Sequence, residues 1–109
     1  MRTVVIYNLP FSHVRLGNLV YDIAGLAGLR GDVRQMATSA GHHVFVQFRS
    51  PVSSAHFVHW CQTNDVFVTK DGEIVNGAEA RTAAMRRFSG LHARRGGMVH
   101  AEFARKECA

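Results

Sequence analysis

The sequence has 109 residues, a formal net charge of +5 at pH 7 and an isoelectric point near 10. This length supports one modest hydrophobic core, and the basic balance favours a polyanionic partner such as a nucleic acid. No apolar run approaches the ~20 residues that a membrane-spanning helix needs, so we expect no membrane partner. Cys61 and Cys108 lack the spacing of a zinc site or a disulfide framework, which indicates a reducing compartment.

The first predicted element is a strand that Pro10 ends. Its run of β-branched residues favours the extended conformation. Side chains alternate along a strand, so Val4 and Ile6 share one face while Val5 and Tyr7 share the other.

An amphipathic helix follows, with Ser12 as its expected N-terminal cap. Its apolar residues recur at helical spacing: Leu16, Leu19, Val20, Ile23 and Leu26. Gly25 and Gly28 each offer a way to end this helix. Residues 33–38 then predict a second, weaker strand, and residues 39–41 a turn.

Residues 44–48 predict a third strand with alternating sides. Val44, Val46 and Phe48 are expected to face the core. His43, Phe45 and Gln47 are expected to face outward.

A second helix is predicted to begin at Ser50-Pro51, a capping hydroxyl followed by a proline, and to fade near residue 63. Residues 66–69 and 73–75 flank a Lys-Asp-Gly turn and predict a hairpin. Residues 78–88 suit either a helix or a final strand, and residues 98–103 suit either a strand or a terminal helix.

This order of elements predicts the α+β class, and within it a ferredoxin-like βαββαβ sandwich with a C-terminal extension. Such a fold has a four-stranded antiparallel sheet backed by two helices. We expect residues 1–85 to form the domain. We expect residues 86–109 to form a basic extension that supplies the last strand or a helix packing on the sheet.

Two segments resemble the paired strand motifs of the RNA recognition motif family. Residues 4–9, Val-Val-Ile-Tyr-Asn-Leu, resemble the short motif of the first strand, and residues 41–48 resemble the longer motif of the third. The resemblance implies a non-catalytic protein that binds single-stranded RNA on its sheet and takes part in RNA processing, without a cofactor. Two departures are notable, because Val5 and His43 stand where the family usually carries stacking aromatic residues.

On this interpretation the RNA-binding surface is a reduced stacking platform with basic residues around it. The platform residues are Val5, Tyr7, His43 and Phe45. The residues expected to meet phosphates are Arg2, Arg34, Arg49 and Lys70. A stacked base contributes about 1–3 kcal/mol, so an incomplete platform predicts weak to moderate affinity. The alternative is that the aromatic residues pack beneath the C-terminal segment and the arginines form a solvated face.

A narrower likeness involves the first helix and the second strand. Residues 21–23, Gly28 and residues 33–35 resemble the small spliceosomal subunit that sits at the branch site. That resemblance implies a nuclear role in mRNA splicing, within a ribonucleoprotein and with a larger protein partner.

A peptide-binding adaptor is the alternative function. Arg86-Arg87-Phe88 has the Arg-x-Phe form of peptide-binding relatives of the motif, although an ordinary helix explains it equally. Catalysis is not expected, because the first loop carries no glycine-rich phosphate cradle. His56 and His59 lack a third metal ligand, and Cys61 suits a buried helix position, so we expect neither a metal site nor a nucleophile.

Overall fold

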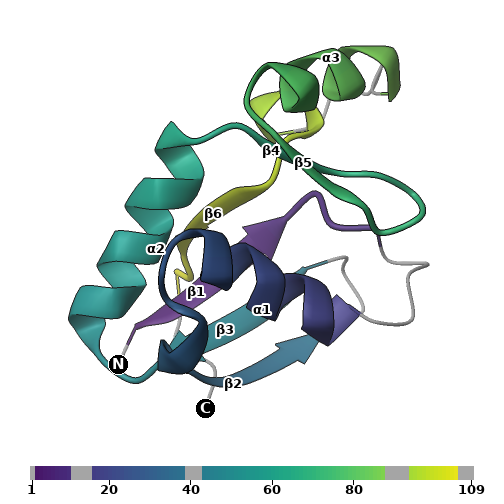
Figure 1. The fold of residues 1–109 in the computed structure, drawn as a ribbon. Coiled ribbons are helices and arrows are strands. Elements are labelled where there is room, and N and C mark those ends of the chain that lie inside the picture. Colours follow the sequence, from purple (N-terminus) through teal and green to yellow (C-terminus); the bar gives the residue numbers. More distant parts are fainter. Residues whose placement is uncertain (1, 11–15, 39–42, 88–93, 106–109) are drawn as a thin grey trace.

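The computed structural model describes residues 2–10, 16–38, 43–87 and 94–105. In this part of the chain the fold is α+β, with a four-stranded antiparallel sheet and three α-helices (Figure 1). The predicted fold class is therefore confirmed at this level. None of the described helices is long and apolar enough to cross a membrane.

The main sheet is built from strands that are far apart in the sequence. It comprises β1 (Thr3–Tyr7), β2 (Val33–Thr38), β3 (Val44–Phe48) and β6 (His100–Phe103), in the order β2-β3-β1-β6. Strand β1 pairs antiparallel with both β3 and β6. The segment 98–103, which suited either a strand or a helix, thus supplies the fourth strand through residues 100–103, which lie within the expected C-terminal extension.

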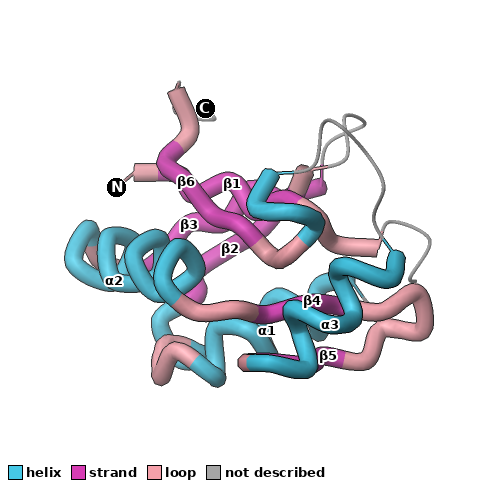
Figure 2. The backbone as a smooth tube through the Cα atoms, turned by 90° about the horizontal axis from the view of Figure 1, so that it is seen from above, coloured by secondary structure: helices cyan, strands magenta, loops and turns pink. Residues whose placement is uncertain are grey.

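Helices α1 (Leu16–Leu26) and α2 (Pro51–Thr63) lie on the same side of this sheet (Figure 2). The largest buried side chains fill the space between them and the strands, among them Phe48, Phe57, Ile6 and Ile23. The rings of Phe48 and Phe57 lie 5.0 Å apart between their centroids. This contact joins β3 to α2.

Helix α1 ends in a Schellman motif centred on Gly28. The Gly28 N–H donates to the carbonyl of Gly25 at 3.0 Å, and the Leu29 N–H donates to the carbonyl of Ala24 at 2.8 Å. Gly28 has a φ of 77°, which a residue with a side chain rarely adopts. Of the two candidate glycines, Gly28 therefore ends the helix, whereas Gly25 lies inside it.

Helix α2 begins as predicted. The Ser50 Oγ accepts a hydrogen bond from the Ser53 N–H at 3.1 Å, and Pro51 occupies the first turn. Ser12, the cap expected for the first helix, lies outside the described residues.

A smaller unit packs at one end of the main sheet (Figure 1). It contains the predicted hairpin, made of β4 (Val66–Val68) and β5 (Ile74–Asn76), and the helix α3 (Ala78–Arg87). The segment 78–88, which suited either a helix or a strand, is therefore helical as far as residue 87. The unit's own core consists of Phe67, Ala80 and Ala84. The Val99 N–H donates to the Val66 carbonyl at 2.7 Å and ties this unit to the start of β6.

Candidate binding face of the sheet

The sheet has a second face, turned away from α1 and α2. Because side chains alternate, the buried Val4, Ile6 and Val46 point to the helices and their neighbours point the opposite way. We call this second side the outer face. Its residues are Gln35, Ala37, Thr3, Val5, Tyr7, His43, Phe45, Gln47, His100 and Glu102.

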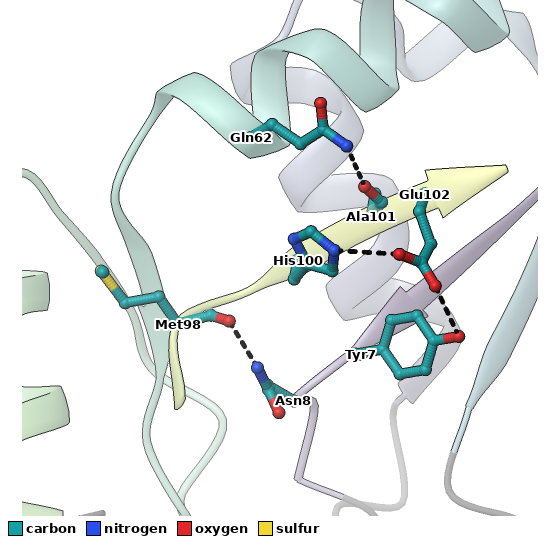
Figure 3. A network of polar contacts seen from close by, with 7 residues as sticks. All are labelled: Tyr7, Asn8, Gln62, Met98, His100, Ala101 and Glu102. Atoms are coloured by element: carbon teal, nitrogen blue, oxygen red, sulfur yellow. Dashed lines mark hydrogen bonds and ion pairs between the residues drawn. The ribbon is translucent and has the colours of Figure 1, made fainter. Parts of the chain in front are cut away.

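A cluster of rings and one carboxylate lies at one end of the outer face (Figure 3). The Tyr7 ring meets the His43 ring edge to face, with centroids 4.5 Å apart, and lies 6.0 Å from the His100 ring. The Tyr7 hydroxyl donates to Glu102 Oε1 at 3.1 Å, and His100 Nε2 lies 3.3 Å from Glu102 Oε2. We call Tyr7, His43 and His100 the aromatic cluster.

The glutamate is the hydrogen-bond acceptor at the centre of this group. A carboxylate accepts hydrogen bonds, so its contact with His100 Nε2 is a hydrogen bond in the tautomer that carries a proton on Nε2. The Nδ1 atoms of both His43 and His100 are buried and have no hydrogen-bond partner in the described part of the chain. A buried polar atom without a partner costs about 1–3 kcal/mol, and such atoms are uncommon in ordinary packing.

Phe45 and Val5 lie side by side in the centre of the outer face, as cross-strand partners of β3 and β1. Phe45 is half-buried, as are Tyr7 and His43. Val5 is only 4% exposed and offers almost no surface to a ligand. The platform predicted from the sequence is thus reduced to three rings, which are accessible in part.

Amides occupy the other end of the outer face. The Gln35 Nε2 donates to Gln47 Oε1 at 2.9 Å, and the Gln47 Nε2 contacts Thr3 Oγ1 at 3.4 Å. Side-chain amides donate and accept hydrogen bonds and can therefore contact base edges. Counted from Thr3 to Tyr7, β1 spans about 13 Å between this amide end and the aromatic cluster.

The four basic residues predicted to meet phosphates separate into two groups. Arg34 is exposed where the register of β2 shifts, and Arg49, just beyond β3, donates from Nε to the Gly31 carbonyl at 3.1 Å. The Arg2 guanidinium lies 4.1 Å from the centre of the Phe103 ring. These arginines are at the amide end. Lys70 lies at the opposite end, in the turn of the hairpin, and is exposed.

The residues predicted for a protein partner are on α3, outside the main sheet. Arg86 is exposed there, Arg87 is the last residue of the helix, and Phe88 lies outside the described residues. His56 and His59 are exposed on α2, whereas Cys61 is buried. In the part of the chain that the structure describes, no group of three or more His, Cys, Asp or Glu residues is placed to hold a metal ion.

Two members of the candidate site were missed from the sequence, namely His100 and Glu102. Their signal was the alternation in residues 98–103, where positions 100 and 102 must share a face if the segment is a strand. Comparison of the chain with protein-family models, with curated proteins and with solved structures gives no match.

Proposed function

We propose that this chain is a non-catalytic RNA-binding protein of RNA processing, whose outer face binds a short stretch of single-stranded RNA. We also propose that its sheet and first two helices form a ferredoxin-like arrangement of the kind found in RNA recognition motifs. The strand order β2-β3-β1-β6, with α1 between β1 and β2 and α2 after β3, supports that assignment.

The observation that carries the proposal is the distribution of side chains on the outer face. Half-buried aromatic rings lie at its centre and at one end, and exposed cations lie beyond both ends. Bases stack on aromatic rings, whereas phosphates are bound by positive charge. An extended strand of RNA that follows β1 would therefore meet aromatic rings and cations one after the other. The net charge of +5 favours the same partner.

Two features lower the expected affinity. Val5 contributes no stacking surface, and the Glu102 carboxylate places a negative charge on the face that the RNA would approach. A carboxylate can still accept hydrogen bonds from base amino groups, which favours bases over phosphates at that position. We therefore propose weak to moderate binding, assisted by a protein partner in a ribonucleoprotein. The resemblance of residues 21–23, Gly28 and residues 33–35 to the branch-site family extends this proposal to splicing in the nucleus.

The test is fluorescence-polarisation binding to a mixed-sequence single-stranded RNA at low and moderate salt. Phe45→Leu keeps an apolar side chain but removes the ring, and we expect it to weaken binding roughly 5- to 150-fold, the loss of ~1–3 kcal/mol per stacked base. Tyr21→Leu removes a ring from α1, on the other side of the sheet, and should leave binding unchanged. Equal affinities of wild type and Phe45→Leu, or no binding by wild type, would refute a role of the outer face in RNA binding.

A peptide-binding adaptor is the second candidate, and α3 provides the observation in its favour. Met85 is 83% exposed on this helix. The same helix and Val75 line a shallow depression whose other lining residues are Ala78, Glu79, Thr82, Ala83 and Arg86. Exposed apolar surface of this kind suits a protein partner better than a base. Under this alternative Met85→Lys would abolish capture of a protein from an RNA-processing complex, and Phe45→Leu would not.

A further inference from the structure

A pocket opens beyond the end of β1, at the residues that follow Tyr7 in the chain. Its volume is about 270 Å³. Its walls come from the loop after β1, from the hairpin and from the 3-10 turn Arg94–Gly97 that precedes β6. The lining residues are Asn8, Leu9, Pro10, Phe67, Val68, Lys70 and Gly97.

Local structure holds the pocket in place. Asn8 has a φ of 70°, a left-handed conformation that asparagine tolerates better than most residues. Its side-chain Nδ2 donates to the Met98 carbonyl at 2.7 Å, which joins the loop after β1 to the segment entering β6 (Figure 3). The two walls that carry Asn8 and Gly97 are therefore fixed to each other.

The same two segments carry the aromatic cluster. Asn8 follows Tyr7 directly in the chain, and the segment from Gly97 leads into His100. At about 3.3 Å per residue, the pocket begins within one or two residues of the Tyr7 position along β1. A strand of RNA with one base on the cluster would bring the neighbouring nucleotide to the pocket.

The chemistry of the walls fits one nucleotide. Leu9, Pro10, Phe67 and Val68 make the walls apolar, and Lys70 is the charged residue among the described residues that line the pocket. Lys70 forms no ion pair with a carboxylate of the described residues, although Asp71 and Glu73 are close to it in the chain. The volume of the pocket lies just below the ~300–1,000 Å³ of pockets for drug-sized ligands, so the pocket can hold only a small ligand or one part of a larger ligand.

We propose that this pocket is a second nucleotide subsite of the RNA-binding surface. It takes the base next to the one on the aromatic cluster, with the base beside the half-buried Pro10 and a phosphate at the Lys70 ammonium. This inference rests on the proposed function, because the neighbouring base must be held by the outer face.

The first experiment measures the salt dependence of binding to a fluorescent single-stranded RNA. Lys70→Met should weaken binding roughly 2- to 5-fold at low salt, as expected for one exposed ion pair. It should also lower the slope of log affinity against log salt by about 0.7, the contribution of one phosphate contact in a single strand. Arg86→Met removes the same charge on α3, away from the pocket, and should leave the slope unchanged.

The second experiment needs no variant and locates the base directly. RNA carrying 4-thiouridine is cross-linked to the wild-type protein, and the linked residues are located by fragmentation of the linked peptides in the mass spectrometer. Links to Pro10 or Phe67, together with links to Tyr7 or Phe45, would support the subsite.

The outcomes separate the two proposals. Links to Tyr7 or Phe45 without links to Pro10 or Phe67 would overturn the subsite and leave the outer face as the RNA-binding surface. An unchanged salt slope in Lys70→Met would overturn the phosphate contact in the same way. Absence of RNA binding by wild type would overturn the proposed function and the subsite together.

Discussion

The hydroxyl of Tyr7 donates a hydrogen bond to the carboxylate of Glu102 at 3.1 Å, although 95 positions separate the two residues. Tyr7 lies on β1 and Glu102 on β6, and the same carboxylate also contacts His100. One carboxylate therefore connects two strands and fixes the orientation of two rings of the aromatic cluster.

Removal of this hydroxyl should be measurable as a loss of stability. We expect Tyr7→Phe to lower the free energy of unfolding by about 1–2 kcal/mol, because the lost hydrogen bond has a charged acceptor but is only partly buried. Both residues have further contacts, so the pair is isolated by a double-mutant cycle with Glu102→Gln in urea denaturation. Strictly additive effects in the double variant would mean that the two side chains are not coupled.

Two glycines three positions apart should respond oppositely to the same substitution. Gly25→Ala should stabilise the protein by about 0.5–1 kcal/mol, since the position is helical and an added Cβ meets nothing closer than 3.9 Å. Gly28→Ala should destabilise it by about 1–2 kcal/mol, since its φ of 77° is strained for alanine. Thermal denaturation of both variants checks the sign. A Gly28→Ala protein as stable as wild type would argue against the Schellman motif.

The N-terminal cap of α2 should account for part of the stability of that helix. Ser50→Ala removes the acceptor of the Ser53 N–H and should cost about 1 kcal/mol. Thr63→Ala serves as the control at the other end of the helix. Its hydroxyl is exposed and contacts two carbonyls of the preceding turn and the side-chain amide of Asn64, so its loss should change stability by less than about 0.5 kcal/mol. Chemical denaturation of the two variants should give clearly different midpoints.

Substitutions at the contact between α2 and β3 should lower the stability of the protein more than substitutions elsewhere in the core. Phe57 is fully buried against Phe48, so Phe57→Ala should cost about 3–5 kcal/mol, a large share of the stability of a small domain. Val52 lies on the same helix but is 78% exposed, and Val52→Ala should change stability by less than about 0.5 kcal/mol. Comparable losses in the two variants would contradict the placement of α2.

Local signals in the sequence were sufficient to predict most of the helices and strands. The β-branched run at residues 4–6, the alternation at residues 44–48 and the Ser50-Pro51 start each act over a few residues, and each predicted its element. The hairpin was predicted for the same reason, since its two strands are joined by a short turn. The outward positions of His43, Phe45 and Gln47 followed from alternation alone.

The fourth strand, β6, could not be predicted from local signals, because its partner β1 is far away in the sequence. Residues 100–103 become a strand by pairing with β1, and no short-range pattern encodes that contact. His100 and Glu102 were missed for the same reason. The contact of the Arg2 guanidinium with the Phe103 ring could not be predicted either, because only the pairing of β1 with β6 brings Phe103 close to Arg2.

The position of β1 also constrains the order in which the protein can fold. This strand is internal to the sheet, yet one of its neighbours is among the last described residues of the chain. Until residues 100–103 have left the ribosome, β1 would present an unpaired edge with free backbone groups, the usual template for association between chains. Closing so long a loop is also slow, since pairing of distant segments lowers the folding rate. We therefore expect the nascent chain to depend on rapid docking of β6, and a chain that stops before residue 100 to aggregate.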